Sequence, residues 1–309
     1  MSKIKNKAPV LVLEGGLSAE REISFKSAAS VQNALHQLGY SVLSFDMKKG
    51  IDALKTLIER EKPFCIFNAL HGGWGENGHV PALLNMLKIP YTHSGLFASA
   101  LGMNKTASKA IASSLDIDIP KGILSAKEWI LKNEKSDFDA VIKPNQEGSS
   151  VGVVILKKCD PIPTSLKEEA LNGKSFVVEE YIKGREFSVA VTDEEVLGMI
   201  ELIPQDGFYD YEHKYRKGKT KHVIPTDLSV QTVEKLCDAA LKMHRFLGCK
   251  GVSRSDFRYD EELNRIVFLE INTHPGMTDL SLVPEIALQK GISYNELVEY
   301  LITKADFEK

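Results

Sequence analysis

The chain has 309 residues, of which 43% are hydrophobic and 26% are charged, and its formal net charge at pH 7 is -3. This length exceeds that of one ordinary hydrophobic core and predicts two or three domains. The weakly negative charge excludes the basic surface of a nucleic-acid-binding protein, and no segment is long and apolar enough to span a membrane.

Two local features bear on the cellular compartment. The cysteines are scattered and lack C-x-x-C spacing: Cys65, Cys159, Cys237 and Cys249. They predict neither a zinc site nor a disulfide framework and fit a reducing cytosol. The basic residues 1–7 and the apolar residues 8–13 imitate a signal peptide, but the apolar run is too short and ends in Glu14-Gly15-Gly16. We therefore expect a buried strand there and a cytoplasmic protein.

From Val10 to about Gly95, predicted strands alternate with helices. The strands cover residues 10–13, 42–45 and 64–70. Apolar residues recur at helical spacing from Ala28 to Leu38, and Gly39 ends that helix. Strands separated by helices imply a parallel sheet covered by helices, which is an α/β fold. Ligands of such sheets bind at the carboxyl ends of the strands.

Two glycine-bearing loops follow these predicted strands, at residues 15–22 and 71–78. The first lacks the G-x-G-x-x-G spacing of a dinucleotide site, and Glu20 would repel a pyrophosphate. A tight turn before an acidic first helical turn explains it equally well. In the second loop, His71 alone is more often a hydrogen-bonded loop residue than a catalyst. The surrounding glycines indicate close approach of a ligand or of a neighbouring loop.

Between about Leu101 and Gly184 the composition changes. Residues 104–115 are predicted to form a helix, and residues 140–145 a strand that carries Lys143 near its end. The small-residue loop 146–152 is either an ordinary hairpin or a flap whose N–H groups cover phosphates. It is not a Walker A motif, because the G-K-[ST] ending is missing.

From Arg185 to Lys309 we expect a hairpin, a long loop, a helix, two strands and terminal helices. The long loop, residues 205–225, mixes tyrosines with lysines and an arginine. Loops of this length are usually functional or disordered. Its aromatic content argues against a merely solvated basic loop and favours a lid that closes over phosphates.

The two predicted strands carry the most informative pattern. Glu270 and Asn272 share one face of their strand, as do Arg254 and Asp256 of the preceding strand. By the same alternation Glu270 should share its face with Phe268. A carboxylate on so apolar a strand is costly unless it is paired or bound to a metal. A half-exposed sheet with a polar rim is one interpretation. We favour a site of oxygen ligands, Asp256, Glu270 and Asn272, suited to Mg²⁺.

Taken in order, these motifs resemble the D-alanine–D-alanine ligases of the ATP-grasp superfamily over essentially the whole chain. The matching segments are Gly15 to Ser24, His71 to Glu76, Met103 to Lys105, Lys143-Pro144, Glu147 to Gly152, Phe208 to Tyr215, Arg254 to Asp256, Glu270 to Thr273, and Pro275 to Pro284. Each segment alone is weakly specific, whereas the ordered set is highly specific.

The resemblance implies an N-terminal α/β substrate domain (1–100), a central ATP-grasp subdomain (101–184) and a C-terminal ATP-grasp subdomain with lid and metal site (185–309). It also implies an ATP site. The implied ATP-binding residues are Lys105, Lys143, Gly148, Ser150, Val151, Glu179, Tyr181, Ile182, Glu186 and Lys214. Two Mg²⁺ (or Mn²⁺) ions would be held by Asp256, Glu270 and Asn272.

The implied reaction joins two D-alanines through D-alanyl phosphate to D-alanyl-D-alanine, a peptidoglycan precursor. The catalytic group would comprise Glu20, Ser149, Tyr215, Arg254 and the backbone N–H of Gly276. Glu20 would bind the ammonium of the first D-alanine, and Arg254 and Gly276 would stabilise the tetrahedral oxyanion. His71, Ser281 and Leu282 would contact the substrates. Tyr215 favours a dipeptide product, because related ester-forming ligases carry Phe there.

Some positions depart from the family pattern: Asn77, Pro81, Ala82, Asn104, Gln146 and Ser255. None removes an implied metal ligand or phosphate-binding lysine. Three alternatives stay open: an ATP-grasp ligase with another acceptor, a silent nucleotide-binding protein and a nicotinamide-dependent oxidoreductase. The intact charged residues argue against the second, and the missing glycine fingerprint against the third. The family also implies a homodimer formed through the N-terminal helices.

Overall fold

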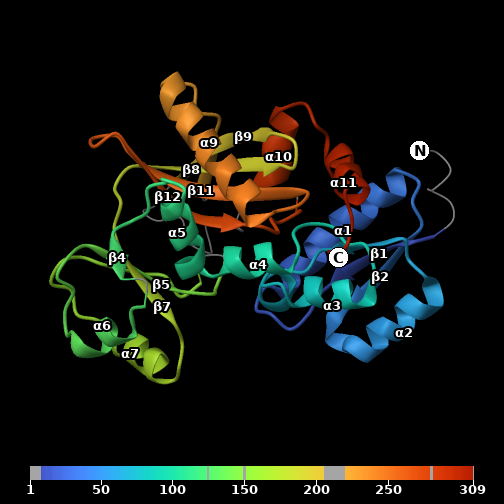
Figure 1. Cartoon of the computed structure of the whole chain (residues 1–309), viewed down its shortest axis with the longest axis horizontal. Helices are drawn as coiled ribbons and strands as arrows, with labels where there is room; N and C mark the ends of the chain where they lie inside the picture. Colours follow the sequence, from blue (N-terminus) through green and yellow to red (C-terminus); the bar gives the residue numbers. More distant parts are fainter. Residues whose placement is uncertain (1–7, 124, 149–150, 205–219, 279–280, 309) are drawn as a thin grey trace.

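The fold is described from a computed structural model, which covers residues 8–123, 125–148, 151–204, 220–278 and 281–308. Within these residues the strands form a three-stranded, a five-stranded and a four-stranded sheet. The N-terminal and central parts lie at opposite ends of the molecule, with the five-stranded sheet between them (Figure 1). Among the helices in these ranges, none has the length and apolar character needed to cross a membrane.

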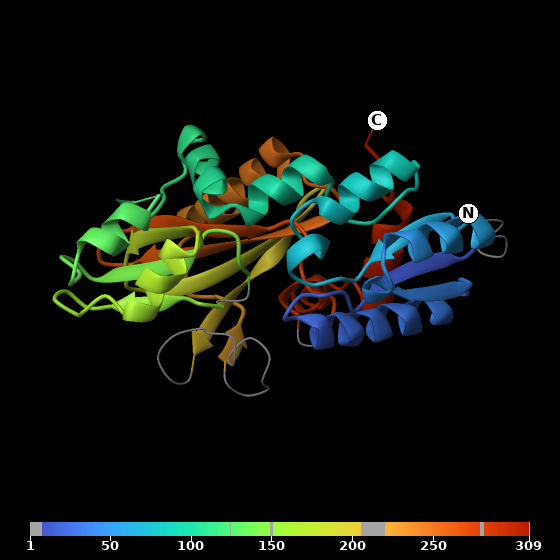
Figure 2. The ribbon, with the colours of Figure 1, turned by 90° about the horizontal axis from the view of Figure 1, so that it is seen from below.

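The N-terminal sheet is parallel, with β1 between β2 and β3, as the alternation of strands and helices predicted. Its elements are β1 (Val10–Glu14), α1 (Arg21–Gln37), β2 (Val42–Asp46), α2 (Ile51–Glu61), β3 (Cys65–Asn68) and α3 (His79–Leu87). Val10 and Val12 lie in one core with α1, whereas Leu11 and Leu13 lie in another with α2 and α3. Both faces of the sheet are therefore covered by helices (Figure 2).

The central part is a four-stranded sheet with neighbours paired antiparallel in the order β4-β7-β5-β6. Its elements are β4 (Gly122–Ile123), α6 (Lys127–Lys132), β5 (Ala140–Pro144), β6 (Val154–Leu156), α7 (Thr164–Leu171) and β7 (Phe176–Glu180). Ile142 and Val178 pack in one core with Ile130 of α6. Because side chains alternate along a strand, Lys143 and Glu179 emerge on the opposite face.

The C-terminal part is an antiparallel sheet in the order β10-β9-β8-β11-β12. Its elements are β8 (Arg185–Thr192), β9 (Val196–Pro204), β10 (Thr220–Val223), α9 (Val230–Leu247), β11 (Val252–Asp260), β12 (Arg265–Asn272), α10 (Leu282–Gln289) and α11 (Tyr294–Thr303). The predicted hairpin is therefore present as β8 and β9. The last helix, α11, returns to the N-terminal sheet, where Leu297 and Leu301 share a core with Val31 of α1.

The prediction that Glu270 and Phe268 lie on the same face of β12 is wrong. Asp256 of β11 pairs with Glu270 of β12, but the next residue, Phe257, pairs with Phe268. Leu269 is therefore an extra residue in β12, which forms a β-bulge at this point. Phe268 is completely buried in the core beneath α9. Glu270 instead lines a pocket on the opposite side. The extra residue breaks the period of two, which is how a bulge redirects a side chain.

Helices α4 (Leu96–Met103) and α5 (Lys105–Ser114) join the N-terminal part to the other two. Asn104 separates them and caps α5, because its Oδ1 atom accepts hydrogen bonds from the N–H of Ala107 (3.1 Å) and from Nδ2 of Asn145 (3.1 Å). An aspartate would serve as an N-cap in the same way. This departure from the family pattern therefore preserves the helix start.

Replacing Ser255 by alanine should stabilise the fold. Ser255 is completely buried on β11 between Val189 and Ile271, and its hydroxyl has no hydrogen-bond partner among the described residues. A buried hydroxyl without a partner costs about 1 kcal/mol or more. Ser255→Ala should therefore raise the melting temperature by about 2 °C in a thermal unfolding scan.

The matched control is Ser253→Ala on the same strand. Ser253 is equally buried, but its hydroxyl lies 2.8 Å from Nδ1 of His244. Removing it leaves that histidine nitrogen without its partner, so this variant should lose stability. Equal losses in both variants would show that the Ser255 hydroxyl is satisfied.

Candidate active site

The structure contains two adjoining pockets. The first lies between the central and C-terminal sheets, and the second lies between the C-terminal sheet and the loops of the N-terminal sheet. Both are lined by Lys105, Glu147 and Glu270. A molecule in one pocket can therefore meet a molecule in the other at these three residues.

Helix α5 supplies the cations of this junction. The Nζ atom of Lys105 lies 3.4 Å from Oε2 of Glu270 and donates a 2.6 Å hydrogen bond to the carbonyl of Glu147. Lys109 follows one turn later on the same buried face and pairs with Glu179. Glu179 also accepts from Lys143, whose Nζ lies 2.9 Å from Oε2. One helix thus contacts a carboxylate on each of the two sheets.

The charges of these lysines decide the ionisation of Glu179. Burial alone would raise the pKa of Glu179, but the charges of Lys143 and Lys109 outweigh it and lower that pKa to about 2. Burial lowers the pKa of Lys109 to about 8, against the opposing charge of Glu179. The carboxylate is therefore anionic at neutral pH, with both oxygens engaged.

The predicted metal ligands share one face of β11 and β12. Asp256 lies directly opposite Glu270 in the register, and Arg254 lies opposite Asn272, so all four side chains point the same way. Arg254 donates to both oxygens of Asp256, at 2.9 and 2.8 Å. Ser188 donates a further 2.6 Å bond to the same carboxylate.

This donor set fits a hard cation. It offers two carboxylates and one amide oxygen, and it contains no nitrogen or sulfur ligand. Nowhere in the described part of the chain do three or more His, Cys, Asp or Glu side chains cluster suitably for a metal. Asn272, which lies opposite Arg254 in the register, is the amide member of the predicted donor set. Its Oδ1 atom now accepts a 2.8 Å bond from the N–H of His274.

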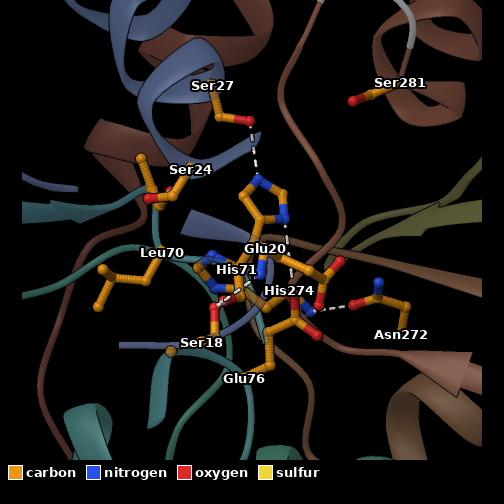
Figure 3. A network of polar contacts seen from close by, with 12 residues as sticks. Ser18, Glu20, Ser24, Ser27, Leu70, His71, Glu76, Asn272, His274 and Ser281 are labelled. Carbon is orange, nitrogen blue, oxygen red and sulfur yellow. Dashed lines mark hydrogen bonds and ion pairs between the residues drawn. The ribbon is translucent and has the colours of Figure 1, made fainter. Parts of the chain in front are cut away.

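The second pocket is formed where α1, the loop after β3 and the end of β12 converge (Figure 3). Glu20 is buried at the N-terminal cap position of α1, where the helix dipole favours a carboxylate. Its backbone N–H donates to Ser18 Oγ (3.2 Å), and that hydroxyl donates to the carbonyl of His71 (2.5 Å). The tight turn before an acidic first helical turn is therefore present, and it is linked by Ser18 to the loop after β3.

Close backbone approach explains two glycines of this pocket. A Cβ atom at Gly72, which has a φ of +63°, would lie 2.6 Å from a carboxylate oxygen of Glu20. A Cβ atom at Gly276 would lie 2.8 Å from the hydroxyl of Ser281 and 3.3 Å from the ring of His71. Both glycines let the two loops close on the same small volume.

His71 occupies the wall of this pocket, as a hydrogen-bonded residue. Its Nε2 atom lies 2.7 Å from Ser27 Oγ, and its Nδ1 atom lies 3.6 Å from Oε1 of Glu76 (Figure 3). Behind it, the rings of His93 and His274 are buried with their centroids 4.2 Å apart. Burial, aided by the neighbouring histidines, lowers the pKa of His274 well below its usual value and that of His93 to about 3. Both rings are therefore neutral at pH 7.

Every predicted site residue that the structure describes lines one of the two pockets. The first pocket contains Lys105, Lys143, Val151, Glu179, Tyr181, Ile182, Glu186, Asp256 and Glu270. The second contains Glu20, His71, Gly148, Arg254, Asn272, Gly276, Ser281 and Leu282. Four predicted residues lie outside the described residues: Ser149, Ser150, Lys214 and Tyr215.

Sequence reasoning missed two residues that line these pockets and two buried residues that lie behind them. Glu76 lines the second pocket, and Arg258 lines the first, where it pairs with Glu186 at 2.9 Å. Lys109 could have been found from its helical spacing to Lys105, which places it on the same helix face. His93 carried no local signal, since only the fold brings it against His274.

Two antiparallel sheets that enclose a cation-lined pocket, preceded by a parallel α/β unit, define an enzyme of the ATP-grasp class. A family model described as the C-terminus of D-Ala–D-Ala ligase matches residues 119–303. A D-alanine–D-alanine ligase of Wolbachia pipientis wMel is 46% identical over 296 residues, which cover 95% of this chain and 93% of the relative. The chain belongs to the D-alanine–D-alanine ligase family.

Solved structures agree with this assignment. The D-alanine–D-alanine ligase of Bacillus anthracis complexed with ATP superimposes with a TM-score of 0.79 at 29% identity and covers 97% of both chains. D-alanyl-alanine synthetase A of Vibrio cholerae gives a TM-score of 0.81 at 26% identity, covering 96% of this chain and 98% of that one. The predicted ATP-grasp fold is therefore confirmed.

Stability should fall below pH 6.5 because of His93. Its pKa is lowered to about 3 from 6.5, so in that window the unfolded chain binds a proton that the folded chain refuses. The stabilisation is complete above pH 6.5 and is lost as the pH falls toward 3. Between pH 7.5 and 5.5 this one group should remove about 1.4 kcal/mol of unfolding free energy.

Urea titrations at pH 7.5 and 5.5 test this expectation with His93→Asn. Asparagine tolerates the left-handed backbone at this position, where φ is +71°. The variant should be less stable at both pH values. The unfolding free energy that it loses when the pH falls from 7.5 to 5.5 should, however, be about 1.4 kcal/mol smaller than the loss in the natural chain. The exposed His36→Asn serves as the control and should leave the difference unchanged. An unaltered difference in His93→Asn would contradict the assignment.

Proposed function

We propose that this chain joins two D-alanines at the expense of ATP, through D-alanyl phosphate, to give D-alanyl-D-alanine for peptidoglycan precursors. The observation that carries the proposal is the junction of two pockets at Lys105, Glu147 and Glu270. A nucleotide in the first pocket can there place its terminal phosphate against a carboxylate held in the second. The relatives, which are D-alanine–D-alanine ligases, support the same substrates.

The first pocket is proposed to hold ATP. Lys105 and Lys143 reach its interior from different elements and supply positive charge for the phosphates. Adenosine is assigned to the far end, against the following residues: Glu179, Tyr181, Ile182 and Glu186. Gly148 and Val151 flank the loop proposed to cover the phosphates, with Ser150 between them. The ATP complex of the Bacillus anthracis ligase supports this use of the pocket.

We propose that Asp256, Glu270 and Asn272 hold two Mg²⁺ (or Mn²⁺) ions. Their oxygen donors and common face support this assignment. When bound, the ions would offset the repulsion between the attacking carboxylate and the phosphates. They would also offset the negative charge of the departing ADP. Arg254, which now binds both oxygens of Asp256, holds that carboxylate in place on the strand.

In the first step, a carboxylate oxygen of D-alanine attacks the γ-phosphorus. A new O–P bond forms, the bond to the β,γ-bridging oxygen breaks, and ADP leaves. Glu20 is proposed to bind the ammonium of this D-alanine, and its burial at the pocket wall strengthens that pairing. His71 lines the same wall. Ser149 and Tyr215 are proposed to hydrogen-bond to Glu20, and Lys214 belongs to the proposed lid, which excludes water from the acyl phosphate.

In the second step, the free amine of the other D-alanine attacks the acyl carbon. The tetrahedral intermediate carries an oxyanion, for which Arg254 and the N–H of Gly276 are the proposed donors. Collapse of the intermediate breaks the C–O bond to phosphate and releases the dipeptide and inorganic phosphate, and the departing phosphate takes up the proton that the amine loses. Ser281 and Leu282 stand at the N-terminus of α10, which suits the carboxylate of the incoming amino acid.

Phosphate release from ATP and Mg²⁺ tests the proposal, with D-alanine, L-alanine or D-lactate added and products identified by mass. Phosphate and a D-alanyl-D-alanine product from D-alanine alone are expected. Turnover only with another acceptor would transfer the proposal to a different ATP-grasp ligase. No turnover with any of them, in a chain that binds ATP, would support a silent nucleotide-binding protein.

Glu270→Gln should fold normally and lose turnover by about two orders of magnitude or more, because it removes a charge at the proposed metal site. Glu262→Gln is the control, since Glu262 is exposed in the turn between β11 and β12. Circular dichroism checks the fold, and steady-state kinetics over a range of Mg²⁺ concentrations measures the loss. Full activity of Glu270→Gln would remove this residue from the metal site.

The remaining assignments concern organisation. We propose domain boundaries at residues 100 and 184, supported by the three sheets, which fall within 10–68, 122–180 and 185–272.

We also propose a cytoplasmic homodimer that associates through its N-terminal helices. The exposed Met86 and Phe97 in that region support it. Sedimentation that shows only a 34.3 kDa monomer at working concentration would reject the dimer.

A further inference from the structure

Lys109 is the most unusual charged residue of this fold. Its side chain is completely buried in the middle of α5, yet it lines neither pocket of the candidate active site. Within the described part of the chain, Glu179 is the only hydrogen-bond partner of its amine. We call Lys109, Glu179 and Lys143 the buried ion triad.

A cation in such a place is costly. A buried ammonium loses its hydration, and a hydrophobic replacement is often as stable as a buried ion pair. Lys109 also stands one turn from Lys105, and like charges at this spacing disfavour a helix. Fold stability alone therefore gives little reason for lysine at this position. The need must come from what Lys109 does to its partner.

The two oxygens of Glu179 have different surroundings. Oε1 contacts Lys109, which is anchored inside the protein, whereas Oε2 contacts Lys143 at 2.9 Å. Lys143 lines the first pocket beside Glu179, so an anionic ligand there competes with Glu179 for the same amine. Once Lys143 turns to such a ligand, Oε2 is left without a donor and Lys109 is the remaining cation of the triad.

We propose that Lys109 is a positioning residue for nucleotide selection. It keeps Glu179 ionised and fixed when Lys143 engages the nucleotide, so that Oε2 accepts a hydrogen bond from an exocyclic amine of the base. Adenine offers a 6-amino donor, whereas guanine presents a 6-oxo acceptor that a carboxylate repels. The inference rests on the proposed ATP site.

Lys109→Met is the main test, because methionine fills a similar volume without a charge. Direct binding of ATP and GTP is measured without D-alanine, by calorimetry, and steady-state kinetics follow. The dissociation constant and KM for ATP should rise about tenfold or more, with a smaller change in kcat. The preference for ATP over GTP should fall by a similar factor. Once Lys143 turns to the nucleotide, Glu179 of this variant has no cation left in the triad, becomes protonated and no longer repels a 6-oxo group.

A double-mutant cycle separates positioning from packing. In a Glu179→Gln background, Lys109→Met should change ATP affinity and base preference little further, because the residue acts through that carboxylate. The exposed Lys132→Met, which breaks a pairing with Glu128 on α6, is the control for loss of a helical lysine and should change neither quantity.

The outcomes are distinguishable. A lowered melting temperature with unchanged ATP affinity and base preference in Lys109→Met would reduce Lys109 to a structural residue and overturn the inference. If Lys109→Met does not fold, the double variant is compared with Glu179→Gln alone. A further tenfold loss of ATP affinity in the double variant would also overturn the inference. A natural chain that binds ATP but does not ligate D-alanine refutes the proposed function alone, whereas one that binds no ATP refutes both.

Discussion

The pairing of helix α5 with two carboxylates on two different sheets is the constraint on which the rest of this structure depends. Lys105 and Lys109 carry like charges one turn apart, and each is matched by an acid: Glu270 on β12 and Glu179 on β7. A site for a polyanion must concentrate cations, and those cations must remain folded and soluble when the polyanion is absent. The internal carboxylates meet that requirement, because they neutralise the lysines without filling the pocket.

Charges on the β11 and β12 side of the first pocket are also neutralised by partners within the protein. Asp256 would be a buried, uncompensated charge, but Arg254 and Ser188 bind its oxygens from the same face of the sheet. The bulge in β12 then turns Glu270 away from the core that holds Phe268. The acids of the site are therefore held in place by strand register and by cationic partners. This advance positioning is what a reaction between anions needs, since few groups have to move as charge develops.

Prediction from the sequence succeeded where one element determined the outcome. The parallel N-terminal sheet followed from strands alternating with helices, and the common face of Arg254 and Asp256 followed from the period of two. It failed at Phe268, because a bulge inserts a residue that no local pattern revealed. It also passed over Lys109 and His93. A lysine on a polar helix and a histidine in a loop look solvent-exposed until the packing that buries them is known.

The sequence by itself determined the chemical groups available to this protein: the oxygen donors at Asp256, Glu270 and Asn272, the cations of Lys105 and Lys143, and the family to which the chain belongs. These depend on residue type, order and short-range periodicity, which the linear chain carries in full. Only the tertiary structure decided which charges neutralise one another and which remain open to a ligand. Lys143 and Glu179 are 36 positions apart, and their 2.9 Å contact exists because β5 and β7 pair in one register. Burial and long-range register arise from the whole chain at once, so no single segment can specify them.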